Sequence, residues 1–360
     1  MRILFTSAPF HGHLNPLLPQ ATAAQQAGHQ VVVATGADLA EHALRIGLPA
    51  WSVGPTNRRS GMPRSLDEFW EAATLRAAGL LPLVEVWDPD LVVAEEMELA
   101  GPIVAARTGA RLVVHGLGIQ AAGDPTAYAD DLDALGRRWA VPDLARRHRD
   151  ALYLQICPPS LAPPEGARPA TELVRPAMGR PLPGERLPES LDALPYAVTV
   201  HLTLGTVFHR RRPEAMADAL AALQGLPVNV VAAVGPDVAP DSFGPQPAHV
   251  LLARYLPHSL LLPRCDLVVS QGGAGILLGA LAHGLPQLVL PQGADQFGNG
   301  AAVERAGAGL TLDDPDVAVG KITDAVRTLL DTPGYGRAAR AVAEEIAAMP
   351  TAEDVIRRIG

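Results

Sequence analysis

Residues 264–300 read RCDLVVSQGGAGILLGALAHGLPQLVLPQGADQFGNG and carry the pattern of two buried parallel strands joined by a glycine turn and a helix. The run 266–270 is short, apolar and β-branched, which is typical of a strand covered on both faces. The glycine turn follows at once, at Gly272, Gly273, Ala274 and Gly275. An apolar run over 276–283 then predicts a helix. Backbone N–H groups at such a turn can approach an anion, and the helix dipole favours negative charge there.

A polar pair follows the second strand of this stretch. Residues 288–290 form that strand, and Asp295 and Gln296 come just past its carboxyl end. Open α/β sheets bind their ligands outside the carboxyl ends of their strands. A phosphate cradle with a polar pair one loop away indicates a sugar that is attached to a diphosphate.

This stretch resembles the nucleotide-sugar signature of family 1 glycosyltransferases, the two-domain GT-B enzymes that glycosylate plant metabolites and bacterial antibiotics. The match continues upstream at 254–257 and 260–263, and downstream at Asn299, Glu304 and 307–309. So long and ordered a match is far more specific than a lone glycine motif. The resemblance implies an α/β protein of the GT-B fold, with two Rossmann-like domains that face each other across a cleft. It also implies a C-terminal helix that returns to the first domain.

Two positions depart from the family pattern. Gln271 stands where the family usually has His, and Ile276 stands where it usually has Thr or Ser. In the family the His helps to neutralise the diphosphate and the hydroxyl donates to it. Gln271 keeps a donor but has no charge, and charge-assisted hydrogen bonds are about twice as strong as neutral ones. These departures keep open an alternative: a GT-B pseudoenzyme, or a helper partner of a true glycosyltransferase, with a weakened diphosphate site.

Composition and charge exclude several classes of protein. A chain of 360 residues is long enough for two domains with cores of their own. The net charge of −9 argues against nucleic acid as a partner. The two cysteines, Cys157 and Cys265, are too few for a disulfide framework or a structural zinc site. The first residues run directly into a strand, and no long apolar run follows, so we expect a cytoplasmic protein without membrane insertion.

No cofactor is expected apart from the nucleotide sugar, which is a co-substrate. The chain has no GxGxxG motif after its first strand, which argues against a dinucleotide and against an epimerase. It also shows no acidic pair that suggests a metal ion. A homodimer and a complex with a helper protein are both compatible with the sequence.

The chain order predicts four segments. Residues 1–157 begin with a βαβ pattern and form a Rossmann-like domain that binds the acceptor. Residues 158–195 contain ten prolines, a density that argues against helices and central strands and favours a semi-rigid linker. Residues 196–345 form the nucleotide-sugar-binding domain, and 346–360 form a C-terminal helix that packs on the first domain.

His13 is the candidate catalytic base. Residues 12–16 resemble the family's GHxNP motif, whose His deprotonates the acceptor hydroxyl, and His13 occupies that position. Independently of the family, an imidazole titrates near neutrality, and the first βα loop, expected over 8–16, places His13 at the carboxyl edge of the sheet. A helix-start hydrogen bond without catalytic chemistry is the alternative interpretation.

A catalytic His often needs a carboxylate that holds its tautomer. Plant members of the family take that Asp from near the end of the strand equivalent to 111–115, where this chain has His115 and Gly116. Glu95 and Glu96, at the end of the predicted strand 89–94, are the nearest substitutes in the topology. The sequence does not choose between them, or between them and two solvated loop carboxylates.

The variable part of the first domain supplies candidates for an apolar acceptor site. The resemblance implies that this part lines the acceptor pocket. The candidates for its wall are Phe10, His11, Trp51, Met62, Phe69, Trp70 and His115. Most apolar residues of this kind simply belong to a core.

The second domain carries the remaining donor-site candidates. Gly205 and Thr206 form a turn at the end of a strand whose motif resembles the family's SLGT, and such a turn offers backbone and hydroxyl donors to a phosphate. Tyr255 stands where the family stacks an aromatic ring on the nucleotide base. Plant members grip the ribose with a Glu eight residues after the motif's His, and here that place is Gly279. We therefore expect a dTDP sugar rather than a UDP sugar.

The function that follows is an inverting, metal-independent glycosyl transfer. We expect a hexose or deoxyhexose to move from a nucleotide diphosphate sugar, dTDP-linked by the argument above, to an apolar natural product. The attacking atom is a hydroxyl oxygen or a carbon, since the sequence leaves C-glycosylation open.

Overall fold

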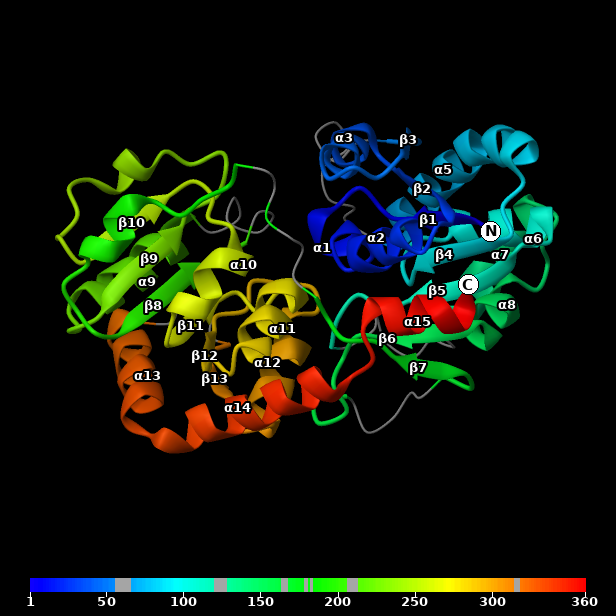
Figure 1. Cartoon of the computed structure of the whole chain (residues 1–360). Helices are drawn as coiled ribbons and strands as arrows, with labels where there is room; N and C mark the ends of the chain where they lie inside the picture. The colour runs from blue at the N-terminus through cyan, green and yellow to red at the C-terminus, as the bar shows by residue number, and fades with distance from the viewer. Residues whose placement is uncertain are drawn as a thin grey trace. The chain divides into compact units, whose positions relative to one another are not determined.

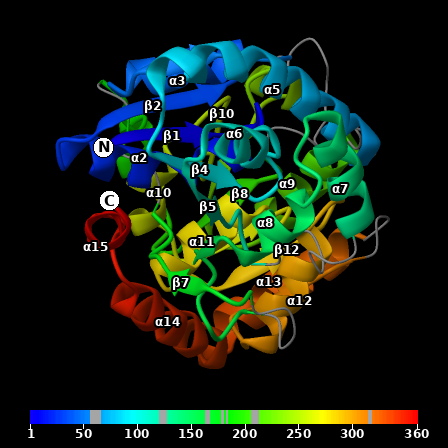
Figure 2. The ribbon, with the colours of Figure 1, turned by 90° about the vertical axis from the view of Figure 1, so that its right-hand side faces the viewer.

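The computed structural model describes residues 1–55, 66–119, 128–162, 168–177, 181, 184–205, 213–313 and 318–360. The chain divides into two compact units, each built on a parallel sheet of its own (Figures 1 and 2). Unit 1 combines Met1–Cys157, Pro163–Gly179 and Met349–Gly360. Unit 2 combines Pro158–Ala162 and Arg180–Ala348.

The described strands of unit 1 form one parallel sheet with the order β3-β2-β1-β4-β5-β6-β7. They are β1 (Arg2–Thr6), β2 (Gln30–Thr35), β3 (Ala50–Ser52), β4 (Leu91–Glu95), β5 (Arg111–His115), β6 (Leu152–Gln155) and β7 (Thr171–Leu173). The helices are α1 (His11–Leu14), α2 (Leu18–Gln26), α3 (Ala37–Arg45), α5 (Leu66–Trp87), α6 (Ala100–Thr108), α7 (Ala129–Arg138), α8 (Leu144–Asp150) and α15 (Ala352–Ile359). The direction of strand order reverses between β1 and β4, which makes that pair the switch point of the sheet.

The core of unit 1 fixes the turn that follows β4. The central strands are apolar and fully buried, as Leu4 and Val92 illustrate. Helix α6 lies close against the sheet because Gly101 has no side chain: a Cβ there would lie 2.3 Å from Thr6 Oγ1. Glu98 accepts from the backbone N–H groups at the start of α6 and forms a buried ion pair with Arg76 at 2.7 Å. Glu98 thereby holds the segment between β4 and α6 against both α5 and α6.

The described strands of unit 2 form a second parallel sheet, with the order β10-β9-β8-β11-β12-β13. They are β8 (Thr199–Thr203), β9 (Asn229–Ala233), β10 (Val250–Ala253), β11 (Leu267–Ser270), β12 (Gln287–Val289) and β13 (Gly309–Thr311). The helices are α9 (Pro213–Gln224), α10 (His258–Leu261), α11 (Ala274–Ala282), α12 (Gln296–Arg305), α13 (Val319–Asp331) and α14 (Pro333–Ala348). The switch point of this sheet lies between β8 and β11.

The last helix belongs to unit 1, as the family resemblance implied. Helix α15 packs on α2, and the chain that leads into it is held by Arg175 N, which donates to Pro350 O at 2.7 Å. Thr351 and Asp354 form a capping box at its first turn. The fold prediction of two Rossmann-like α/β domains is confirmed.

Several local predictions were wrong. The segment 158–195 is not a continuous linker, because β7 pairs with β6 at the edge of the first sheet and η1 (Glu189–Ala193) forms a short 3-10 helix. Proline is tolerated at sheet edges, so its density did not exclude an edge strand. The short strands β3, β6 and β13 were not predicted. The loop expected over 8–16 contains the helical turn α1.

No helix in the described part of the chain is long and apolar enough to cross a membrane.

Candidate active site

The predicted catalytic residues meet at the switch point of the first sheet. Strands β1 and β4 are neighbours, with Thr6 paired to Ala94, so the residues that follow each strand emerge side by side. The chain after β1 leads into α1, which carries His13, and β4 ends at Glu95. Ligands of open α/β sheets bind at this position.

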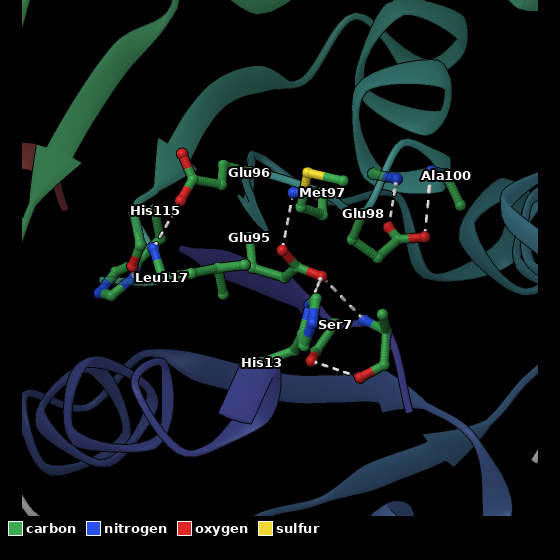
Figure 3. Close-up of polar contacts among 12 residues, drawn as sticks. Ser7, His13, Glu95, Glu96, Met97, Glu98, Ala100, His115 and Leu117 are labelled. Atoms are coloured by element: carbon green, nitrogen blue, oxygen red, sulfur yellow. Dashed lines mark hydrogen bonds and ion pairs between the residues drawn. The ribbon is translucent and has the colours of Figure 1, made fainter. Parts of the chain in front are cut away.

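Glu95 is the carboxylate that contacts His13. Nδ1 of His13 lies 2.8 Å from Oε1 of Glu95, and the carboxylate accepts the bond, so Nδ1 carries the proton (Figure 3). The same oxygen accepts from Ala8 N at 3.2 Å, and Oε2 accepts from Met97 N at 2.7 Å. In a neutral His13 with its proton on Nδ1, the basic nitrogen is Nε2.

The environment keeps Glu95 ionised although its side chain is completely buried. Burial alone would raise the pKa of this carboxyl group. The charge interaction and hydrogen bond with His13, together with the bonds from the Met97 and Ala8 amides, outweigh burial and lower the pKa. An ionised carboxylate at this place stabilises an imidazolium that forms when His13 takes a proton.

Glu96, the other predicted carboxylate, faces elsewhere. Figure 3 shows it turned away from His13, toward Leu117. Its Oε1 accepts from Leu117 N at 2.8 Å, and its Oε2 accepts from Tyr153 Oη at 2.9 Å. Burial raises the pKa of Glu96, against the smaller opposing effects of these bonds and of Arg168. Of the two alternatives that the sequence left open, the geometry selects Glu95 as the neighbour of His13.

Two phenylalanine rings complete the surroundings of His13. The ring centroids of His13 and Phe10 are 5.3 Å apart, and those of His13 and Phe69 are 5.9 Å apart with an interplanar angle of 28°. Phe10 and Phe69 lie 6.1 Å from each other, so the three rings form a triangular cluster. Phe10 was predicted as an acceptor contact, and its side chain is buried in this cluster.

The other predicted acceptor residues are dispersed through unit 1. His11 is exposed and meets His42 edge-on, while Trp51 packs against Trp87 and Trp70 against Tyr128. The Nε1 group of Trp70 is buried and has no hydrogen-bond partner among the described residues. His115 is fully buried and donates from Nδ1 to its neighbour's carbonyl, which does not favour a direct acceptor contact. Met62 lies outside the described residues.

The predicted residues of the glycine turn lie at the switch point of the second sheet. Strand β11 leads through Gln271 and Gly272 into α11, whose first turn contains Ala274 and Gly275. Gly272 has φ +84°, and a Cβ there would lie 2.5 Å from Val289, so only glycine fits this turn. The first N–H groups of a helix have no partner within the helix and favour an anion.

Gln271 lies between the turns that follow β8 and β11. A Cβ at Gly205 would lie 2.4 Å from Gln271 Nε2, and one at Gly273 would lie 2.8 Å from it. Its Oε1 is buried and has no hydrogen-bond partner in the described part of the chain. Thr206, the predicted hydroxyl donor beside Gly205, lies outside the described residues. The side chain of Ile276 is buried in the first turn of α11.

Asp295 and Gln296 have different surroundings. Asp295 is exposed at the start of α12, where Asn299 Nδ2 donates to its Oδ2 at 2.8 Å. The same Nδ2 group donates to Gly272 O at 2.9 Å, so the polar pair and the glycine turn are linked. Gln296 is buried, and its Oε1 accepts from Gln292 N at 2.7 Å and from Gly293 N at 3.2 Å. The side-chain oxygen of Gln296 therefore stabilises the loop that precedes α12.

Tyr255 offers an exposed ring at the end of β10. Its side chain is 63% exposed, as a ring that stacks on a nucleotide base must be. Burial of its hydroxyl and the neighbouring Glu185 raise the pKa of Tyr255 to about 12, so the phenol stays neutral.

Sequence reasoning named two further contributors to these sites but did not predict what they contact. Phe69 was expected only as pocket wall, because nothing in a linear sequence shows that the start of α5 reaches His13. Gly205 was expected only as part of a phosphate turn. Its closeness to Gln271 could not be predicted, because it depends on the pairing of β8 with β11. In the described residues, no group of three His, Cys, Asp or Glu side chains is arranged to hold a metal ion.

Family models match both units. The model described as "Erythromycin biosynthesis protein CIII-like, N-terminal domain" covers residues 59–170, and the corresponding C-terminal domain covers 217–360. The L-demethylnoviosyl transferase of Streptomyces niveus is 33% identical, over 98% of this chain and 95% of its own length. The chain belongs to the erythromycin biosynthesis protein CIII-like family of glycosyltransferases.

Other comparisons agree with this membership. The elloramycin glycosyltransferase ElmGT of Streptomyces olivaceus is 32% identical over 100% of this chain and 97% of its own. The structure titled spinosyn rhamnosyltransferase SpnG complexed with thymidine diphosphate superimposes with a TM-score of 0.86, at 27% identity and with both chains covered completely. This chain is accordingly a glycosyltransferase of the GT-B fold, and the alternative of an inactive helper is not favoured.

Proposed function

We propose that this glycosyltransferase moves a hexose or deoxyhexose from a dTDP-linked donor to an apolar natural-product acceptor, with inversion at the anomeric carbon. His13 Nε2 takes the proton of the acceptor group as that group attacks the anomeric carbon. The bond between that carbon and the diphosphate oxygen breaks, and the nucleoside diphosphate leaves. The observation that carries the proposal is the 2.8 Å contact between His13 and the ionised Glu95 at the switch point of the first sheet.

The acceptor reaction needs a base that is neutral before attack and charged after it. With the proton on Nδ1, the basic nitrogen of the neutral imidazole is Nε2, and the carboxylate of Glu95 lies where the positive charge develops. A positioned base contributes roughly 10²–10⁴-fold to the rate of such a proton transfer.

The donor site is proposed at the start of α11. The N–H groups of its first turn meet the charge that develops on the diphosphate, with Gln271 and Thr206 as neutral donors and Tyr255 stacked on the base. Asp295 binds sugar hydroxyls, for which its exposed carboxylate at the start of α12 is suited. No cofactor or metal ion takes part in the proposed reaction.

The dTDP preference rests on the ribose site. Gly279 is buried in α11, so the place at which plant family members carry a ribose-binding Glu has no side chain. Without that Glu, a ribose lacks a partner for both its 2′- and 3′-hydroxyls, whereas a 2′-deoxyribose has no 2′-hydroxyl and loses fewer hydrogen bonds. SpnG, which is similar to this chain, has solved complexes with thymidine diphosphate and with spinosyn aglycone, and these complexes support a dTDP donor and a hydrophobic acceptor.

The proposal is tested by comparing wild-type protein with His13→Ala. Binding of dTDP and UDP to both proteins is measured by calorimetry, and transfer from dTDP sugars to a panel of polycyclic and macrolactone acceptors is followed by mass spectrometry. We expect dTDP to bind more tightly than UDP, with equal affinity in both proteins, and transfer to fall by roughly 10²–10⁴-fold in His13→Ala. Undiminished transfer by the variant would exclude His13 as the base, and tighter binding of UDP would exclude the donor assignment.

A further inference from the structure

The ring of Phe69 packs against the imidazole of His13. The two rings are close to parallel, with an interplanar angle of 28° and centroids 5.9 Å apart. Phe69 lies in the first turn of α5, whereas His13 lies in α1, so the contact is tertiary. The side chain of His13 is only 20% exposed, because Glu95 and the phenylalanine rings cover most of it.

Two constraints together determine the orientation of an imidazole ring. The Nδ1 bond to Glu95 holds one edge of the ring. The Phe69 ring, whose plane is inclined by 28° to that of the imidazole, packs against it and limits rotation of the imidazole about its Cβ–Cγ bond. With Nδ1 and the plane both held, the direction of Nε2 is determined as well. Proton transfer depends on that direction, since acceptor and base must align within hydrogen-bond reach.

The aromatic face also favours the charged form of His13. The face of a phenylalanine ring carries negative charge density and attracts a cation within about 6 Å of its centroid. Phe10 and Phe69 both satisfy this distance. The Phe69 ring is the more nearly parallel of the two to the imidazole, at 28° rather than 50°. An imidazolium that forms during transfer gains from this arrangement, whereas the neutral ring before transfer gains little.

We propose that Phe69 is a positioning residue of the glycosyl transfer, which holds the plane of the His13 imidazole and stabilises its protonated form. The inference rests on the proposed role of His13 as the base. Phe69, in the first turn of α5, would thereby affect the chemical step through its contact with His13. A residue that merely lines the acceptor site would instead act on acceptor affinity.

The decisive variant is Phe69→Leu, which keeps an apolar side chain of similar bulk but has no ring. We expect kcat to fall by roughly 2- to 30-fold, the range that corresponds to a cation–π contact. The KM for the acceptor should change by less than about twofold. Phe69→Tyr keeps the ring face and should restore kcat to near the wild-type value. Val86→Ala, at an 88% exposed position of the same helix, is the control for general effects of substitution in α5.

A double-mutant cycle separates this inference from the function on which it rests. In a His13→Ala background, Phe69→Leu should have no further effect on kcat, because the group through which it acts is absent. Equal losses from Phe69→Leu in both backgrounds, a loss confined to acceptor KM, or no rescue by Phe69→Tyr would each overturn the inference. A fully active His13→Ala variant would instead overturn the proposed function.

Discussion

At the scale of single residues, the site depends on how neighbouring carboxylates are separated. Glu95 is the last residue of β4, whereas Glu96 begins the turn that follows it, and the two side chains lie in different surroundings. Glu95 meets an imidazole and two amides, which lower its pKa, whereas burial raises the pKa of Glu96. Glu95 is thus the ionised partner of His13, whereas its neighbour Glu96 bonds to Tyr153 and to the Leu117 amide.

This difference gives a paired prediction. Glu95→Gln keeps the shape of the side chain but removes the charge that meets the imidazolium, so kcat should fall by on the order of 10²-fold or more. Glu96→Gln keeps one acceptor oxygen for Leu117 N, and its amide can donate to Tyr153 Oη, so it should cost less than about fivefold. Steady-state kinetics on both variants, with thermal melts to confirm folding, provide the comparison. A larger loss in Glu96→Gln would mean that the carboxylate partner of His13 has been misassigned.

The donor site offers a second prediction at this scale, which concerns the two departures from the family pattern. Gln271→His would place a cation beside the α11 turn, and a charge-assisted hydrogen bond contributes roughly 1.5–3 kcal/mol. Affinity for dTDP should rise by about tenfold or more at pH 6, where the imidazole is protonated, and by less at pH 8. Calorimetric titrations at the two pH values measure this, and an increase that is the same at both would show that the added charge is not responsible.

Ile276→Thr should not add to that gain. The Ile276 side chain is buried, so a Thr hydroxyl there would be placed among apolar groups instead of facing a phosphate. Burying a hydroxyl without a partner costs about 1–3 kcal/mol by mutational data. We expect a lower melting temperature for Ile276→Thr and unchanged dTDP affinity, and a tighter complex with dTDP would contradict the buried placement.

At the scale of elements, the two sheets use the same topological device. Each reverses its strand order once, at β1/β4 in unit 1 and at β8/β11 in unit 2, and each gathers candidate site residues just past that pair of strands. The adjacent parallel strands end together, so residues distant in sequence emerge as neighbours. Glu95 and His13 are 82 residues apart and Gly205 and Gln271 belong to different βα units, yet each pair is in close proximity.

The last helix gives a prediction at this scale. Thr351 accepts from Asp354 N at the start of α15, and Asp354 accepts from Thr351 N in return. Thr351→Ala removes one bond of this capping box and should lower the stability of unit 1 by about 0.5–2 kcal/mol. Tryptophan fluorescence during urea unfolding measures it, because Trp51, Trp70, Trp87 and Trp139 all belong to unit 1. The control is Thr328→Ala, on helix α13 of unit 2, which should not change the urea midpoint of the fluorescence transition. A shift of that midpoint equal to the one in Thr351→Ala would mean that the signal does not report on the cap.

At the scale of the whole molecule, buried histidines make stability depend on pH. Burial lowers the pKa of His115 and of His258 to about 4 and that of His148 and of His201 to about 3. Below the ordinary value near 6.5, the unfolded chain binds protons at these positions that the folded chain does not bind. Stability is therefore full above about pH 6.5 and is lost as the pH falls toward 4.

His201 allows a direct test of this loss. Its Nδ1 donates to Val231 O at 2.8 Å, and an Asn side chain can place an amide donor near the same position without titrating. The difference in unfolding free energy between pH 7.5 and pH 5 should be smaller in His201→Asn than in the wild type, by up to about 2 kcal/mol. Far-UV circular dichroism must be the probe, because unit 2 contains no tryptophan. An unchanged pH dependence would show that His201 takes up no proton on unfolding in this range.

Local patterns in the sequence by themselves determined the α/β class, the glycine turn before α11, the family and the position of the candidate base. Strand periodicity, turn residues and ordered motifs extend over a few to a few dozen residues, and they report on covalent neighbours. The apolar run over 111–115 therefore matched β5 residue for residue, and residues 12–16 identified His13. The same local rules failed for β3 and β7, strands of three residues whose existence depends on the neighbour with which they pair.

Only the tertiary structure decided which groups meet. The register that places Thr6 beside Ala94 brings Glu95, and not Glu96, to His13. The packing of α5 brings the ring of Phe69 against the same imidazole. In the second unit, the side-chain oxygen of the buried Gln296 accepts from the Gln292 amide of the preceding loop. Hydrogen bonds and ring contacts depend on distances of a few ångströms between segments that are distant along the chain. Those distances are set by sheet pairing and close packing, which no local pattern of residues contains.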